Sequence, residues 1–484
     1  MQGFFTHFWP LLLALIQIAA MAGAAIHAIL TKTDERAAAG WVGLIVLVPF
    51  VGWLVYLLIG VNRIERRALE MRGKKHKAYF PIPVPTADHS DHPMIPAPAP
   101  APELASLARF GQQILTEPLE PGNALRILVN GDEAFPAMIE AINSAERSLA
   151  LSTYIFNNDK AGQQFLAALI KAQERGVRVR LLIDGVGSWY SFPSLIPLLE
   201  KSNLNYARYL HSFMPWQMPY LNMRNHQKIM VVDGKTGFTG GMNISKGNLI
   251  ADKPDHPILD HHFEVRGPVV GQLMSTFANE WNFTTGEVLG GPDWFPDIEP
   301  CGNILARGLA AGPDLSQNPI RWTMLGAIAQ ARHRIRIVTP YFVPDAVLRT
   351  ALSVAAMRGI SVDVVLPQNN NLPYVAWASA PQQEWISRSG CRVWKTHGPF
   401  AHSKLMTVDG EWTMIGSANW DDRSLRLNFE FNLECYGHEF AEAINRLIDR
   451  KIAAATPITY AELAARPFMI RLRDAAMRLA SPYL

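Results

Sequence analysis

The sequence predicts an α/β protein in which two homologous lobes share one site and follow an N-terminal transmembrane hairpin. Three observations predict this fold. Two apolar stretches open the chain, β-branched runs alternate with helical patterns from about residue 108 onward, and one polar motif occurs twice. A chain of 484 residues is long enough for several large cores. We divide it into a hairpin (1–62), a basic segment with a Pro/Ala-rich linker (63–107), a first lobe (108–304) and a second lobe (305–484).

The two apolar stretches cover residues 10–30 and 37–60, and each has the roughly twenty residues that cross a bilayer core of about 30 Å. A short charged hinge at 32–36 separates them, so they predict a transmembrane hairpin. Gln17 and His27 are polar residues inside the first stretch. A cleaved signal peptide is the alternative. It is disfavoured because the chain begins without a basic segment and a second long span follows at once.

A basic segment follows the second stretch, with seven Arg and Lys residues against two Glu between positions 63 and 77. By the positive-inside rule this flank, and everything after it, stays on the cytoplasmic side. The same charges attract anionic lipid headgroups. Prolines interleaved with alanines at 81–102 predict an extended spacer. The three cysteines have no disulfide-like or metal-like spacing and are read as reduced thiols of a cytosolic body.

The two lobes align element by element. Each contains a buried strand running into a loop, a second strand entered from a helix through an Arg-Gly pair, and a third strand leading to the repeated motif. We expect mostly parallel pairing between these strands. The matching segments are 148–157 with 334–345, 176–185 with 359–368, and 206–210 with 391–396.

The repeated motif has the spacing H-x-K-x-x-x-x-D, followed by a Gly-Gly or Gly-Ser pair and an Asn. Its Asp-Gly dipeptide predicts a tight hairpin turn between two strands, and alternation along the strand places His and Lys on one face. The motif residues are His226, Lys228, Asp233 and Asn243 in the first copy, and His402, Lys404, Asp409, Ser417 and Asn419 in the second.

Two histidines, two lysines and two asparagines converging on one pocket predict a site for a tetrahedral anion such as phosphate. Lysines act as point charges on phosphoryl oxygens, and Asn243, Ser417 and Asn419 are the expected phosphate-binding donors. One histidine attacks phosphorus to form a phosphohistidine, while the other protonates the leaving alkoxide and then deprotonates the acceptor. No carboxylate cluster with metal-ligand spacing accompanies the motif, so we expect metal-free chemistry without a cofactor.

Four carboxylates near the motif have two interpretations each. Asp233 and Asp409 are either catalytic or structural carboxylates at the turn. Asp260 and Glu430 lie at comparable offsets in the two lobes and either orient the histidines through their second ring nitrogen or are ordinary polar strand residues.

The doubled motif and its Gly-x-x-Asn sequels resemble the phospholipase D superfamily. The segments TPYFVPD (339–345), GSANWDDRSLRLNFEFN (416–432) and the terminal SPYL are similar to those of bacterial cardiolipin synthases. The resemblance implies an enzyme of the bacterial cytoplasmic membrane that transfers a phosphatidyl group from one phosphatidylglycerol to another and releases glycerol. It also implies that His226 is the nucleophile and His402 the acid and base, which the symmetry of the motif alone leaves open. The first half-site departs from the family pattern at Gln227, Ser245-Lys246 and Ile258-Leu259.

Three other functions remain as alternatives. A phospholipase D would pass the phosphatidyl group to water or to another alcohol. A nuclease is disfavoured because it would not need the hairpin and the body lacks a basic stripe with interleaved aromatics, so no nucleic-acid partner is expected. A silent lipid-binding scaffold is disfavoured because both half-sites are intact.

Two further apolar segments bear on lipid contact. Residues 211–223 are rich in Phe, Met, Trp and Tyr and are equally consistent with an interfacial loop and with core. Near the C-terminus an apolar helical stripe predicts a helix that packs on the body, with membrane contact as the alternative. The stripe consists of Phe468, Leu472, Ala475, Ala476 and Leu479, with Arg471, Arg473 and Arg478 nearby.

Overall fold

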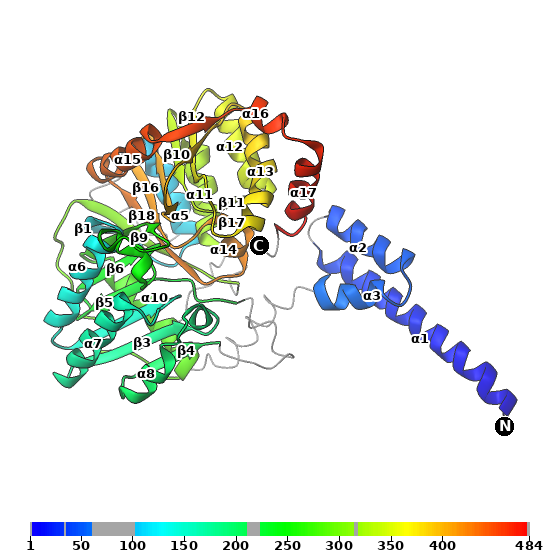
Figure 1. The fold of residues 1–484 in the computed structure, drawn as a ribbon, viewed down its shortest axis with the longest axis horizontal. Coiled ribbons are helices and arrows are strands. Elements are labelled where there is room, and N and C mark those ends of the chain that lie inside the picture. The colour runs from blue at the N-terminus through cyan, green and yellow to red at the C-terminus, as the bar shows by residue number, and fades with distance from the viewer. Residues whose placement is uncertain (1, 33–34, 61–101, 211–222, 314–317, 482–484) are drawn as a thin grey trace. The chain divides into compact units, whose positions relative to one another are not determined.

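The structure is a computed structural model that describes residues 2–32, 35–60, 102–210, 223–313 and 318–481 (Figure 1). The chain forms two compact units, Met1–Leu69 and Glu70–Leu484. Three predictions fall wholly or largely outside the described residues: the basic flank, the Pro/Ala-rich spacer and the aromatic segment before the first motif.

The N-terminal unit begins with α1 (Gln2–Thr31), and within the described residues this is the one helix long and apolar enough to cross a membrane, over Phe8–Thr31. Gln17 and His27, the polar residues singled out inside its apolar stretch, have partners in the segment that follows. Trp53 donates its indole N–H to Gln17 at 2.9 Å, and the Tyr56 hydroxyl lies 2.7 Å from Nδ1 of His27. These hydrogen bonds lower the cost of placing polar groups in an apolar helix.

The second apolar stretch differs from the single spanning helix that the sequence predicts. It forms α2 (Glu35–Leu47), α3 (Gly52–Val55) and a π-helical turn η1 (Tyr56–Gly60). Thirteen residues of α2 extend only about 20 Å, which is short of a bilayer core. The break falls at Pro49, which lacks a backbone N–H, and at Phe50, whose φ is 70°.

The body is one compact unit with a continuous fifteen-stranded mixed sheet. The strands of its first half are β1 (Glu120–Val129), β2 (Ser148–Thr153), β3 (Arg178–Asp184), β4 (Tyr206–Tyr209), β5 (Ile229–Val232), β6 (Thr236–Gly240), β7 (Ile258–Leu259) and β8 (His261–Arg266). The strands of its second half are β9 (Ile304–Ala311), β10 (Arg334–Val338), β11 (Phe342–Val343), β12 (Ser361–Pro367), β13 (Arg392–Thr396), β14 (Phe400–Ala401), β15 (Leu405–Val408), β16 (Trp412–Gly416), β17 (Trp420–Asp421), β18 (Glu430–Tyr436) and β19 (Ala455–Ile458).

The order of the large sheet repeats on either side of its central β9–β1 pair. Outward from β1 the strands are β8, β6, β5, β2, β3 and β4, and outward from β9 they are β18, β16, β15, β10, β12, β13 and β19. The segments matched in the sequence therefore occupy equivalent places: β2 with β10, β3 with β12, and β4 with β13. The strand β19 is an addition at the second edge.

The prediction of mostly parallel pairing is wrong. Within the large sheet, parallel pairs are confined to β2–β3–β4 and β10–β12–β13, and the remaining neighbours are antiparallel. The reason is the Asp-Gly turn in each motif, because a tight turn joins only antiparallel neighbours. The motif hairpins β5–β6 and β15–β16 thus separate the outer parallel strands from the centre.

Helices cover both faces of the sheet. In the first half these are α6 (Asn130–Ser144), α7 (Lys160–Glu174), α8 (Ile196–Lys201) and α10 (Val270–Thr285). In the second half they are α11 (Pro319–Gln330), α12 (Ala346–Met357), α13 (Pro373–Arg388), α14 (Asp422–Arg426), α15 (His438–Ala453), α16 (Tyr460–Ala464) and α17 (Phe468–Arg478), joined by α5 (Ala105–Ile114), which packs on α11. Each half has its own buried core beneath these helices, and the motif strands β5 and β15 contribute to one core each.

Candidate active site

Each motif ends in a tight turn that a carboxylate ties to the neighbouring strand. Asp233 has a φ of 50° and Gly234 a φ of 64°, as a two-residue hairpin turn requires. The Asp233 carboxylate accepts three backbone N–H groups, those of Glu146, Arg147 and Ser148, at 2.7–3.0 Å.

The second motif repeats this arrangement. The Asp409 carboxylate accepts the backbone N–H groups of Arg332, His333 and Arg334 at 2.7–2.9 Å. A four-residue strand separates each aspartate from its motif lysine. These contacts favour the structural interpretation of Asp233 and Asp409, because each carboxylate accepts three backbone donors at the start of β2 or β10.

The motif histidines lie just before β5 and β15, where each approaching segment pairs with the other half of the body. The backbone N–H of His226 donates to the carbonyl of Phe429 at 2.9 Å, and that of His402 donates to the carbonyl of Leu259 at 2.7 Å. The short strands β14 and β7 pair in parallel just before His402. This reciprocal exchange brings both histidines to the seam between the halves.

The side chains of the histidines are also held across the seam. Nδ1 of His226 lies 3.0 Å from Oε2 of Glu430 in the second half, and Nδ1 of His402 lies 2.8 Å from Oδ2 of Asp260 in the first half. Both carboxylates are fully buried. The sequence left Asp260 and Glu430 either as orienting residues or as ordinary polar strand residues, and the structure places each within hydrogen-bond distance of the histidine of the opposite half.

Both motif lysines donate to the backbone carbonyl of their own histidine, Lys228 to His226 at 2.6 Å and Lys404 to His402. Nζ of Lys404 also lies 2.9 Å from Nε2 and 3.0 Å from Nδ1 of the His402 ring. Lys228 also faces the ring of Tyr154, with Nζ 5.4 Å from the ring centroid. Nε2 of His402 therefore has a lysine partner in this structure, while the Lys228 ammonium contacts the His226 carbonyl and the Tyr154 ring.

Burial sets the protonation of these groups. Burial lowers the pKa of His226 and of His402 to about 4, against the opposing effect of the carboxylate beside each ring. Burial also lowers the pKa of Lys228 to about 7 and that of Lys404 to about 8. Each lysine lowers the pKa of the other half's histidine, which places all four groups within electrostatic reach of one another. Both rings are thus neutral at pH 7.

The predicted phosphate-binding donors are Ser417, Asn243 and Asn419, and the structure gives each of them a hydrogen-bond partner. Ser417 does not offer a free hydroxyl, because its Oγ donates to Glu430 at 2.6 Å and accepts the N–H of Phe431 at 3.0 Å. It therefore positions the carboxylate that holds His226. Asn243 accepts the N–H of Ile155 through Oδ1 at 3.2 Å, and Asn419 donates Nδ2 to Ser424 at 3.2 Å. The side-chain N–H₂ of Asn243 takes no part in the hydrogen bond with Ile155, so Asn243 stays a predicted phosphate donor.

Two tyrosines join the site without a prediction from the sequence. The Tyr154 ring meets His226 edge-on at 5.0 Å between centroids, and the Tyr341 ring meets His402 edge-on at 6.4 Å. They occupy equivalent places after β2 and β10, in the matched segments STYIF and TPYFV. That repetition of Tyr was the signal that could have identified them.

A buried polar group supports the approach to His226. Asp184 at the end of β3 accepts the N–H groups of Asn225 and Gly187, each at 2.7 Å, and burial raises its pKa to about 6. Arg224 donates to the Tyr154 hydroxyl at 2.9 Å. In the second half, burial raises the pKa of Asp421, the N-cap of α14, to about 7.

The departures in the first half-site are accommodated within the seam. Gln227 is buried, with its backbone N–H held by Asn225 at 3.1 Å, and Ile258-Leu259 form the strand β7 that receives the second motif. In the described part of the chain no group of three or more His, Cys, Asp or Glu side chains has the arrangement of a metal site.

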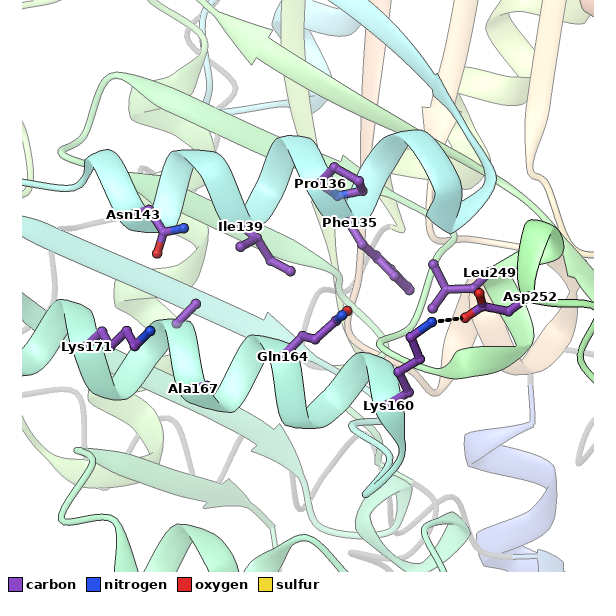
Figure 2. A pocket seen from close by; sticks show the side chains of 11 residues that line it. Phe135, Pro136, Ile139, Asn143, Lys160, Gln164, Ala167, Lys171, Leu249 and Asp252 are labelled. Atoms are coloured by element: carbon purple, nitrogen blue, oxygen red, sulfur yellow. Dashed lines mark hydrogen bonds and ion pairs between the residues drawn. The ribbon is translucent and has the colours of Figure 1, made fainter.

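A hollow of about 490 Å³ lies elsewhere, between α6 and α7. Figure 2 shows Phe135, Ile139 and Leu249 along it, with the Lys160–Asp252 ion pair at one end. None of the predicted site residues lines this hollow.

Fold and site together define a phospholipase D-like protein. The family described as "Cardiolipin synthase, PLD-like domain" matches residues 138–281 and 324–452, and the one described as "Phospholipase_D-nuclease N-terminal" matches residues 19–60. The chain is 33% identical over 452 residues to a cardiolipin synthase of Geobacillus thermodenitrificans, covering 92% of this chain and 88% of the relative. It is 30% identical to cardiolipin synthase A of Pseudomonas fluorescens over the full length of both. The chain belongs to the cardiolipin synthase family.

A solved structure supports the fold. The phosphatidylserine synthase of Haemophilus influenzae matches with a TM-score of 0.61 and 16% identity, covering 78% of this chain and all of that one. The resemblance indicated by the motifs is therefore confirmed, and with it the class of enzyme, a phosphatidyltransferase.

Proposed function

We propose that this enzyme transfers a phosphatidyl group from one phosphatidylglycerol to a second and releases glycerol, the reaction of a cardiolipin synthase. The observation that carries this proposal is the pair of motif histidines, each held at Nδ1 by a carboxylate of the opposite half. A hydrogen bond from Nδ1–H to a carboxylate leaves Nε2 of a neutral ring as a lone pair, which is what an attack on phosphorus needs.

In the first half-reaction Nε2 of His226 attacks the phosphorus of the donor lipid. A P–N bond forms and the P–O bond to the glycerol headgroup breaks. The leaving oxygen takes a proton from Nε2 of His402 and departs as glycerol. The phosphodiester anion favours the charged imidazolium and so raises the pKa of His402 when the lipid binds, which supplies that proton.

In the second half-reaction a hydroxyl of the other phosphatidylglycerol attacks the same phosphorus. Its proton goes to His402, a new P–O bond forms and the P–N bond to His226 breaks. One phosphodiester replaces another, so no nucleotide is consumed. Lys228 and Lys404 stabilise the negative charge on the phosphoryl oxygens in both steps.

The assignment of His226 as nucleophile has structural support. Both lysines donate to the carbonyl of their own histidine, but Lys404 in addition lies 2.9 Å from Nε2 of His402, whereas the second described contact of Lys228 is with the Tyr154 ring. A covalent adduct formed with radiolabelled phosphatidylglycerol should therefore map to His226, and an adduct on His402 would reverse the roles.

The wider architecture belongs to the same proposal. The repeated strand order supports two homologous lobes, 108–304 and 305–484, that share one site. The N-terminal unit would hold the enzyme in the bacterial cytoplasmic membrane, with α1 and the broken second stretch as a hairpin and the body on the cytoplasmic side, near anionic lipids. A reporter fused to the C-terminus should then be inaccessible from outside the cell.

The decisive experiment supplies purified enzyme with phosphatidylglycerol in mixed micelles and follows the lipid products. Cardiolipin and glycerol in equal amounts are expected. Phosphatidic acid without cardiolipin would make water the acceptor and replace the synthase with a phospholipase D. His226→Ala and His402→Ala should each reduce turnover by at least about 10³-fold, and substantial activity in either variant would contradict the two-histidine mechanism.

A further inference from the structure

The helix α17, near the C-terminus, packs on the body through one face only. Its Asp474 is buried and accepts Arg466 at 2.7 Å and Arg473 at 2.7 Å. Met477 packs against a small apolar cluster of α13 and β11 that contains Val343 and Val375. These contacts fix the side of α17 that faces the protein.

The opposite side of α17 is apolar and exposed. Phe468 is 73% exposed, Leu472 50% and Leu479 78%, and at 100° per residue these three side chains point within about 40° of one another. The sequence predicted that this stripe packs on the body, and that prediction is wrong. Asp474 and Met477 provide the packing side instead, and the stripe faces outward.

Positive charges border the exposed stripe. Arg471 and Arg478 lie on one side of it, while Arg473 lies on the other with its guanidinium 4.4 Å from the Trp377 ring centroid. Two acidic groups lie beside them. Asp474 pairs with Arg473 at 2.7 Å, and Glu384 is held by Arg466 at 3.2 Å and lies 4.0 Å from Arg471. An apolar stripe with an arginine border is the composition of a helix that lies in a membrane interface.

The packing side of α17 adjoins the catalytic seam. The cluster that receives Met477 also includes Tyr341, whose ring contacts His402. On the other half-site, Tyr190 lies 6.1 Å from Tyr154 between ring centroids and is 60% exposed. Its neighbour Phe192 is 99% exposed, so an aromatic loop lies beside His226 as α17 lies beside His402.

We propose that α17 is an interfacial helix that inserts Phe468, Leu472 and Leu479 into the bilayer surface, so that the seam opens toward the phospholipids it uses. The inference rests on the proposed function, since a lipid substrate is what makes a bilayer the partner. A phosphodiester lies at headgroup depth, and an enzyme seated at that depth reaches it without extracting the lipid.

Depth can be measured on the full chain. Cys301 is exposed while Cys391 and Cys435 are buried, so Cys301→Ser leaves a background for labelling. In that background Leu472→Cys is labelled with the environment-sensitive fluorophore nitrobenzoxadiazole. The labelled protein is placed in vesicles of phosphatidylglycerol and phosphatidylethanolamine. The vesicles also contain spin-labelled lipid, which quenches a fluorophore that enters the bilayer. Quenching is expected at position 472. The matched control is Glu174→Cys, an exposed residue of α7 on the opposite side of the body from α17 (Figure 1), where none is expected.

A kinetic split provides the second readout. Phe468→Ser with Leu472→Ser should raise KM for phosphatidylglycerol in vesicles by about tenfold and leave kcat unchanged, because only the seating on the surface is lost. Activity on short-chain phosphatidylglycerol dispersed as monomers should not change. Val288→Ser, which removes a side chain that is 54% exposed beyond α10, should change neither value.

The outcomes separate this inference from the proposed function. Active enzyme without quenching at 472 overturns the interfacial helix and leaves the synthase reaction standing. Quenching at 472 in a protein that makes no cardiolipin supports the helix while removing the synthase. A label response that needs no lipid and grows with protein concentration assigns the face to a second copy of the chain and also overturns the proposal.

Discussion

The buried carboxylates Asp260 and Glu430 hold the rings of the two motif histidines at Nδ1. Glu430→Gln and Asp260→Asn keep the shape of each side chain but remove the charge that favours Nδ1–H, so the reactive lone pair at Nε2 is no longer selected. Each variant should lose about 10²- to 10⁴-fold in kcat. The measurement is steady-state turnover alongside thermal unfolding, and an unfolding temperature near that of the wild type shows that the loss is chemical.

The two substitutions should also differ in the step that they slow. Glu430→Gln acts on the proposed nucleophile and should reduce the rate at which the phosphohistidine forms. Asp260→Asn acts on the proposed acid and base and should slow its breakdown by the acceptor as well. Equal accumulation of adduct in both variants would contradict the division of labour between His226 and His402.

The pH dependence of kcat/KM follows from the pKa values of the free enzyme. Burial lowers the pKa of Lys228 to about 7 and that of Lys404 to about 8, so these ammonium groups lose their protons as pH rises through that window. Phosphate binding needs them charged, and kcat/KM should fall on the alkaline side with apparent pKa values that belong to the coupled pair. Near pH 4 protonation of His226 removes the nucleophile, while His402, whose pKa is also about 4, must carry the proton that the leaving oxygen takes, so the slope on the acid side belongs to the coupled pair of rings. A profile that stays flat up to pH 9 would contradict the lysine assignment.

Sequence alone identified most of the side chains that the structure brings together at the seam and missed the tyrosines beside them. The histidines and lysines could be predicted because they occur twice at a fixed spacing, and Asp260 and Glu430 because they lie at comparable offsets after the two motifs. Ser417 was misassigned because a hydroxyl beside a glycine has the same appearance whether it binds phosphate or, as here, Glu430. Tyr154 and Tyr341 were missed because an aromatic residue after a buried strand is most often core.

At the scale of the element, the motif turns depend on one carboxylate each. Asp409→Ala leaves three backbone N–H groups without their acceptor and should destabilise the body by about 2–4 kcal/mol. Asp409→Asn keeps one acceptor oxygen and tolerates the positive φ of 53°, so it should cost less. Chemical denaturation measures both. A normal unfolding midpoint with lost turnover in Asp409→Ala would restore a catalytic role to this residue.

The sequence predicted an element well where the local residue pattern determines its structure, and poorly where contacts with distant chain segments determine it. The Asp-Gly turns and the equivalence of β2 with β10 follow from local sequence. The antiparallel centre of the sheet does not follow from local sequence, because strand order depends on which distant segments of the chain pair with each other. Pro49 was the sequence signal for the break after α2, but the prediction gave more weight to the apolar residues on both sides of it.

At the scale of the molecule, the site exists only where the two halves meet. Each histidine takes its carboxylate from the other half, and the halves are further joined by the central β9–β1 pair. The seam is thus part of a continuous sheet, which explains why 108–304 and 305–484 form one compact unit although the sequence repeats between them.

This arrangement predicts how two inactive variants behave together. If His226 and His402 act within one chain, mixing His226→Ala enzyme with His402→Ala enzyme should restore no cardiolipin synthesis, because every molecule lacks one half of its own site. The control mixes wild-type enzyme with either variant at a constant total concentration, and activity should follow the wild-type fraction linearly. Recovery toward one quarter or more of wild-type activity in the mixed inactive pair would show that halves of different chains combine. Since Asp260 and Glu430 contact their histidines within the same chain, we expect the mixture to stay inactive.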